Sequence, residues 1–132
     1  NGDVALDDDS SVMHKSVLLI ENDTVLKELI QALDLPFNVS ITQADQAFVG
    51  LKLASSQKFD FIFVDLMLHQ VDGLDIIRLL KWHPMSQSSR LIATSRQVNG
   101  TQESTTLTAG ANYFLRKPIR SDELIAALTN SD

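Results

Sequence analysis

The stretch Phe61-Ile62-Phe63-Val64-Asp65 places four apolar, strand-forming residues directly before a single carboxylate. A short apolar run of this kind is typical of a strand buried inside a sheet. In open α/β sheets, ligands bind in the crevice at the carboxyl ends of the strands. Asp65 is therefore the first candidate for a functional residue, and the alternative is an ordinary acid that caps a turn.

The segments on both sides of this stretch alternate between short apolar runs and longer runs with helical periodicity. The expected strands are 16–20, 37–42, 60–65, 90–94 and 112–115, and the expected helices are 23–33, 44–55, 72–82, 100–109 and 121–129. Strands that alternate with helices of this length form βαβ units, which give a parallel sheet with helices on both faces. We therefore predict a flavodoxin-like (βα)5 fold, a three-layer α/β sandwich with a five-stranded parallel sheet.

The same periodicity predicts which helical residues face the core. In the second expected helix, the residues that share the apolar register are Ala47, Phe48, Leu51 and Ala54. Trp82, at the end of the third helix, is expected to be a packing residue. The fourth helix is rich in Ser and Thr, which compete for backbone hydrogen bonds, so we expect it to be short, frayed or mobile.

Composition limits the possible functions. The 132 residues are enough for one domain, with 44% apolar and 21% charged residues and a net charge of −6. This composition is typical of a globular domain, and the negative charge argues against direct nucleic-acid binding. The absence of cysteine excludes disulfides, a thiolate nucleophile and a Cys-based zinc site.

No apolar run approaches the roughly 20 residues that a membrane span needs. We therefore expect a cytoplasmic domain with no membrane contact. Residues 1–14 are rich in Asp and poor in apolar side chains, so we expect a disordered acidic tail there and one domain over residues 15–132.

Polar residues follow four of the five expected strands. They are Glu21, Asn22 and Asp23 after the first strand, Asp65 at the third, Thr94 and Ser95 at the fourth, and Lys117 after the fifth. Because the carboxyl ends of parallel strands lie on one edge, these side chains should converge. Carboxylate and amide oxygens suit Mg²⁺, and a hydroxyl with an ammonium suits anionic phosphoryl oxygens.

These motifs, in this order, resemble the receiver domain of two-component response regulators. The resemblance covers nearly everything from Lys15 to Leu128 and rests on the runs 18–23, 63–68, 72–73, 94–95 and 109–118, which read LLIEND, FVDLML, DG, TS and AGANYFLRKP. Each short motif alone is weak, but the ordered set on the expected strand ends is specific.

The resemblance implies a role for each matching residue. Asp65 matches the phosphoacceptor, which takes a phosphoryl group from a phosphohistidine on a sensor histidine kinase or a histidine phosphotransfer protein. Thr94 matches the hydroxyl that binds the phosphoryl group, and Lys117 matches the ammonium that pairs with it. Such a domain is not an enzyme, beyond catalysing its own phosphorylation and dephosphorylation.

The resemblance also implies a metal site and a switch. The matching Mg²⁺ ligands are Glu21, Asn22, Asp65 and the backbone carbonyl of Met67. Thr94 and Phe114 match the two switch residues, and Pro118 is implied to follow a cis peptide bond. The face made by the fourth helix, the fifth strand and the fifth helix is the family's usual output face, for a homodimer or an output domain.

Three residues depart from the family pattern. Asn22 stands where a second acid is usual, and the loss of one negative charge is expected to weaken Mg²⁺ binding. His69 stands where proline is common, which is expected to loosen the loop after Asp65. Phe114 has no hydroxyl, so a switch at this position has to act through packing.

These departures leave alternatives open. Asn22 and Phe114 favour a pseudo-receiver, a protein interaction module that does not need phosphate. A small-molecule enzyme on a flavodoxin-like fold is a remote third class, because no glycine-rich phosphate loop follows the first strand. Asp72 reads as a helix N-cap rather than a catalytic acid, and Glu21 with Asn22 could serve only to cap the first helix.

Overall fold

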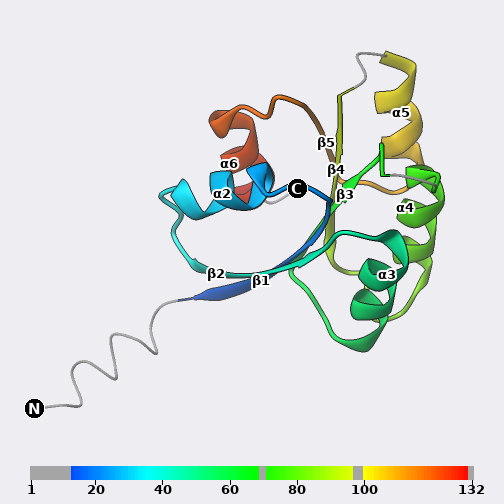
Figure 1. Ribbon diagram of the computed structural model, residues 1–132, viewed down its shortest axis with the longest axis horizontal. Helices are drawn as coiled ribbons and strands as arrows, with labels where there is room; N and C mark the ends of the chain where they lie inside the picture. Colours follow the sequence, from blue (N-terminus) through cyan, green and yellow to red (C-terminus); the bar gives the residue numbers. More distant parts are fainter. Residues whose placement is uncertain (1–12, 69–70, 97–99, 131–132) are drawn as a thin grey trace, which may run out of the picture.

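The computed structural model describes residues 13–68, 71–96 and 100–130, which form a three-layer α/β sandwich (Figure 1). The strands are β1 His14–Ile20, β2 Asn38–Ala44, β3 Phe61–Asp65, β4 Arg90–Ser95 and β5 Tyr113–Arg116. The helices are α2 Val25–Ala32, α3 Ala47–Ser56, α4 Gly73–Trp82, α5 Gly100–Ala109 and α6 Ser121–Thr129. The predicted α/β fold with five parallel strands is confirmed.

The strands form one parallel sheet in the order β2-β1-β3-β4-β5. Helices α2 and α6 cover one face, and α3, α4 and α5 cover the other (Figure 1). The strand order reverses between β1 and β3, so the chain leaves these two neighbouring strands toward opposite faces. This is the place where an open α/β sheet has its crevice, and Asp65 lies at the end of β3.

Strand β3 is buried along its whole length because both of its faces are covered. Phe61 and Phe63 belong to the apolar layer under α2 and α6, while Ile62 and Val64 belong to the layer under the other three helices. The alternation of side chains along a strand thus places apolar groups in both layers. Residues 61–64 are therefore all apolar because each of them faces one of the two buried layers.

Two expectations about helical side chains are wrong. Phe48 is 74% exposed and Trp82 is 78% exposed. Helix α3 buries the expected Ala47 and Ala54 together with Gly50, and a Cβ on Gly50 would come within 2.6 Å of the Ile20 side chain. This close approach through small residues sets the phase of the helix and turns Phe48 outward.

Trp82 lies outward for a related reason. Helix α4 buries Ile76, Ile77 and Leu80, and a residue two positions after Leu80 is rotated by about 200° around the helix axis. Trp82 therefore lies on the side of α4 away from the core.

Helix α5 occupies the full expected range of ten residues, so the expectation of a short helix is wrong. Its one buried residue is Thr106, whose hydroxyl donates to the Gln102 carbonyl at 2.7 Å. The hydroxyl is thus satisfied by the backbone of its own helix.

Strand β1 begins at His14, the last residue of the expected tail. Residues 1–12 of that tail, and His69 in the loop after Asp65, lie outside the described residues. No helix in the described ranges has the length and apolar character to cross a membrane.

Candidate functional site

Asp65 lies at the carboxyl edge of the sheet with its side chain fixed on both oxygens. It is 7% exposed. Its Oδ1 accepts a hydrogen bond from the Met67 backbone N–H at 2.9 Å, and its Oδ2 lies 3.3 Å from the Lys117 ammonium. The carboxylate is therefore held by one donor from its own loop and one from the loop after β5.

Lys117 bridges two buried carboxylates. Its Nζ lies 2.7 Å from Glu21 Oε1, at the end of β1, and 3.3 Å from Asp65 Oδ2. The Lys117 backbone N–H donates to the Ser95 carbonyl, and the following Lys117–Pro118 bond is cis, as the resemblance implies. One ammonium between two carboxylates leaves the cluster with one net negative charge when all three groups are ionised.

The titration of this cluster follows from burial and charge. Burial raises the pKa of Glu21 more than the hydrogen bond from Lys117 lowers it, and the charge of Asp65 raises it further. For Lys117, burial alone lowers the pKa, but the hydrogen bond to Glu21 and the charges of Asp65 and Glu21 together raise it. Both pKa values are raised, which favours the charged form of Lys117 and the neutral form of Glu21, because one cation serves two anions. Lys117 is stabilised as an ammonium, and Glu21 is not fully compensated as a carboxylate.

Thr94 lies opposite Asp65 in the β3–β4 register, and its carbonyl accepts from the Leu66 N–H at 2.9 Å. The side chain is only 1% exposed, yet Oγ1 has no hydrogen-bond partner among the described residues. Buried hydroxyls are nearly always hydrogen-bonded, so an unpaired one calls for an explanation. An anionic group placed next to Asp65 would supply the missing acceptor.

Asn22 follows Glu21 and is exposed, and its backbone N–H donates to Glu21 Oε2 at 3.2 Å. The described parts of the chain contain no group of three or more His, Cys, Asp or Glu that could hold a metal. The oxygen donors here are two carboxylates, the Asn22 amide and the Met67 carbonyl. All are hard oxygen ligands of the kind that Mg²⁺ takes, with less charge than a three-acid site would have.

Phe114, the second switch candidate, lies on β5 opposite Ala93, the residue before Thr94. It is half-buried and packs against the apolar layer under α3, α4 and α5. The ring is thus adjacent to the Thr94 strand, with part of its surface open.

Two acids near the site act as local caps. Asp72 Oδ1 accepts from the Leu74 N–H at 2.9 Å at the start of α4, which confirms the N-cap interpretation. Asp23 Oδ1 accepts from the Val25 N–H at 2.9 Å at the start of α2. Glu21 instead points its carboxylate at Lys117, so the cap-only interpretation of Glu21 is wrong.

Sequence reasoning missed two residues beside the site. The Gln43 amide at the end of β2 donates to the carbonyls of Glu21 and Asp23, at 2.9 and 2.7 Å, and fixes the loop after β1. Arg96 is exposed just after β4 and lines a hollow of about 300 Å³ together with Glu21 and Lys117. Both residues could have been found from their position in the sequence, because both lie at strand ends on the same edge of the sheet as Asp65.

Known proteins share this fold and sequence pattern. The curated relatives include the cell cycle transcriptional regulator CtrA of Caulobacter vibrioides, 26% identical over 85% of this chain and 48% of CtrA. They also include the signal transduction histidine-protein kinase BarA of Escherichia coli, 25% identical over 88% of this chain and 13% of BarA. The chain spans about half the length of the first regulators that it matches, 48 to 56%.

A solved response regulator from Burkholderia pseudomallei, described with a phosphorylated aspartic acid, a calcium ion and citrate, superimposes with a TM-score of 0.74. It is 28% identical over 88% of this chain and 67% of that one. The family model of the response regulator receiver domain matches residues 17–129, nearly the whole of the described domain. With the sheet order and the strand-end residues in agreement, this chain belongs to the receiver domains of two-component response regulators.

Proposed function

We propose that this domain accepts a phosphoryl group on Asp65 from a phosphohistidine of a sensor histidine kinase or a histidine phosphotransfer protein. The observation that carries the proposal is the unpaired, buried hydroxyl of Thr94 opposite Asp65. The Lys117 ammonium lies 3.3 Å from the Asp65 carboxylate. The nucleophilic carboxylate of Asp65 therefore has a hydrogen-bond donor, Thr94, and a cation, Lys117, beside it. An anionic phosphoryl group would satisfy both.

In the proposed transfer, a carboxylate oxygen of Asp65 attacks phosphorus while the P–N bond of the phosphohistidine breaks. The electron pair of that bond returns to the imidazole nitrogen, and Asp65 becomes an acyl phosphate. Lys117 then pairs with phosphoryl oxygen, and the Thr94 hydroxyl donates to another phosphoryl oxygen. Glu21, Asn22, Asp65 and the Met67 carbonyl are the residues that would hold Mg²⁺, which when bound offsets the charge between carboxylate and phosphoryl oxygens.

A relative supports this role. The response regulator from Burkholderia pseudomallei is described with a phosphorylated aspartic acid and a calcium ion. We propose that phosphorylation of this domain requires a divalent cation and that Asn22 makes binding of that cation weak. The output, through a homodimer or an output domain at the α5, β5 and α6 face, belongs to the same proposal.

Intact-protein mass spectrometry tests the proposal. Incubation with acetyl phosphate and Mg²⁺ should add the mass of one phosphoryl group, and chelation of Mg²⁺ should prevent it. Asp65→Asn should abolish the added mass. Asp72→Asn is the matched control, because asparagine also serves as an N-cap, and it should be labelled like the wild type. Equal labelling of Asp65→Asn and the wild type would contradict the assignment.

The pseudo-receiver remains the second candidate because Asn22 supplies no negative charge at the metal site. In that case, the wild type would stay unlabelled at Mg²⁺ concentrations up to tens of millimolar. Binding of the domain to a partner would then be the same for the wild type and for Asp65→Asn. A labelled wild type with partner binding that changes on phosphorylation excludes this second candidate.

A further inference from the structure

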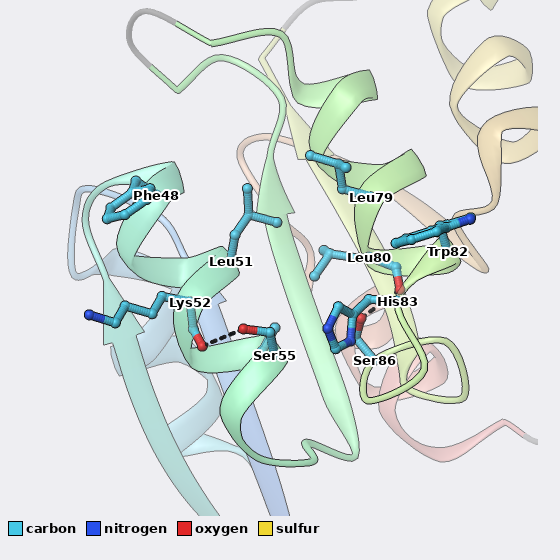
Figure 2. Close-up of a pocket in the computed structure, with 10 residues that line it drawn as sticks. Phe48, Leu51, Lys52, Ser55, Leu79, Leu80, Trp82, His83 and Ser86 are labelled. Atoms are coloured by element: carbon cyan, nitrogen blue, oxygen red, sulfur yellow. Dashed lines mark hydrogen bonds between the residues drawn. The ribbon is translucent and has the colours of Figure 1, made fainter.

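An apolar groove runs between α3 and α4, away from the Asp65 cluster. It has a volume of about 500 Å³ and is lined by residues of both helices and of the loop after α4. Figure 2 shows Leu51 reaching from α3 toward Leu79 and Leu80 of α4, with Phe48 and Trp82 on the two sides. The groove thus has an apolar floor and an aromatic side chain on each helix.

The aromatic and aliphatic groups of the groove are unusually open to solvent. Phe48 is 74%, Leu79 51% and Trp82 78% exposed. Single exposed apolar residues are normal, but three that line one groove mark an interaction site. Aromatic side chains of this kind are also the residue type that contributes most to binding at interfaces.

The hydroxyl groups of the groove are already occupied. The hydroxyl of Ser86 donates to the Leu80 carbonyl at 2.6 Å, and that of Ser55 donates to the Lys52 carbonyl at 2.9 Å (Figure 2). His83 Nδ1 accepts from the Met85 N–H. The groove therefore offers mainly apolar contacts to a partner, and charges only at its rim.

One charged side chain lines the groove, and it is basic in an acidic protein. Lys52 of α3 belongs to the lining and no Asp or Glu does, whereas the whole chain has 17 acids and 11 Lys and Arg. Lys52 is exposed and has no carboxylate partner within the described ranges. Lys81 lies on the other flank of α4, where a Cβ on Gly110 would come within 2.9 Å of its side chain and its Nζ lies 3.3 Å from the Gln87 carbonyl.

The shape of the groove fits a helix. Helices α3 and α4 each have ten residues, which is about 15 Å of length. Phe48 is in the first turn of α3 and Trp82 ends α4, so the two aromatic residues lie near opposite ends of the groove. A helix of about three turns can place apolar residues at i, i+3, i+4 and i+7 along such a groove.

We propose that the α3–α4 groove binds an amphipathic helix of a protein partner, with apolar residues against Phe48, Leu79 and Trp82 and an acidic residue against Lys52. A second copy of this chain fits less well, because a symmetric contact would bring the two copies of Lys52 together. Nucleic acid fits less well because the groove itself is apolar rather than lined by cations. The site does not depend on phosphorylation of Asp65.

Trp82 is the only tryptophan of the chain, so its fluorescence reports on the groove directly. The probes are two synthetic amphipathic helical peptides of about 12 residues, without tryptophan, with the same Leu positions. One carries Glu and the other Lys at its polar positions. We expect the Glu peptide to shift the Trp82 emission to the blue with saturation. It should bind more tightly than the Lys peptide at physiological ionic strength, where the distant acids of the chain are screened.

Variants test the site. Phe48→Asp should weaken Glu-peptide binding at least about tenfold, while Val49→Asp, on the same helix and outside the groove lining, should leave it unchanged. Lys52→Glu should abolish the preference for the Glu peptide. Circular dichroism should show that each variant is folded.

Several results would overturn the proposal. The first is equal binding of the two peptides, and the second is an equal loss in Phe48→Asp and Val49→Asp. The third is a Trp82 shift produced by duplex DNA or by phosphatidylglycerol vesicles but not by the Glu peptide. Gel filtration of the free domain should show a monomer, and a dimer that Phe48→Asp dissociates would assign the groove to a second copy instead.

Discussion

The Asp65 cluster takes its groups from the ends of four strands, whereas the α3–α4 groove takes its side chains from two helices. In the cluster, Glu21, Asp65 and Thr94 are nearly inaccessible to solvent, and the partly buried Lys117 holds the two carboxylates through contacts of 2.7 and 3.3 Å. In the groove, Phe48 and Trp82 are mostly exposed. The sheet therefore positions the groups of the cluster but buries their charges. The aromatic side chains of the groove are exposed and contribute little to the core.

The largest expected effect contrasts two residues of α4. Leu80 is 1% exposed beneath the groove, so Leu80→Ala should lower the free energy of unfolding by about 2–5 kcal/mol. Trp82→Ala should change it by no more than about 0.5 kcal/mol. Urea unfolding followed by circular dichroism measures both. A cost above about 2 kcal/mol for Trp82→Ala would show that the groove is part of the core.

The second effect concerns the contact between α4 and the loop after Asp65. A Cβ on Gly73 would lie 2.6 Å from Leu66 Cα, whereas a Cβ on Gly100 would meet nothing within 4 Å. Gly73→Ala should therefore cost about 1–3 kcal/mol, because backbone has to move. It should also slow labelling of Asp65, the residue before Leu66. Gly100→Ala is the matched control and should be neutral or stabilising by up to about 1 kcal/mol.

The two regions also differ in how far the sequence predicts them. The convergence of Glu21, Asp65, Thr94 and Lys117 could be predicted, because parallel strands must bring their carboxyl ends to one edge. The sharing of Lys117 between Glu21 and Asp65 could not, because it depends on side-chain distances of about 3 Å.

The groove escaped prediction because the phase of α3 is set by its contact with the sheet. Periodicity placed Phe48 with the core, but the small residues Ala47, Gly50 and Ala54 approach the sheet more closely and take that side. Gly50 within an apolar helical pattern could have indicated this close approach. The run 47–59, which has no Asp or Glu, could have indicated a surface of unusual charge.

The third prediction concerns the negative charge available to a metal at the cluster. Asn22→Asp should tighten Mg²⁺ binding by at least about tenfold, because an added unit charge about 4 Å from a dication contributes roughly 2 kcal/mol even in bulk water. Amide chemical shifts during a Mg²⁺ titration measure the affinity. Asn38→Asp, at the opposite end of the sheet on β2, is the control and should not change it. Unchanged affinity in Asn22→Asp would remove Asn22 from the ligand set.

The smallest expected effect is a pH dependence that arises from Glu21. Its pKa is raised above the ordinary value of 4.5, first by burial and then by the charge of Asp65. The folded state therefore keeps this proton to a higher pH than the unfolded state does. The stabilising contribution is complete below pH 4.5 and is lost as the pH rises through the raised pKa.

Comparison with Glu21→Gln isolates this contribution, because glutamine stays neutral at every pH. From pH 4.5 upward, the free energy of unfolding of the wild type should fall relative to that of Glu21→Gln. Saturating Mg²⁺ should reduce the difference, because a dication next to Glu21 favours its charged form. A wild type that instead gains stability relative to Glu21→Gln over this range would mean that Lys117 compensates Glu21 fully. The buried charge of the cluster would then carry no cost, and the contrast with the uncharged floor of the groove would be one of exposure alone.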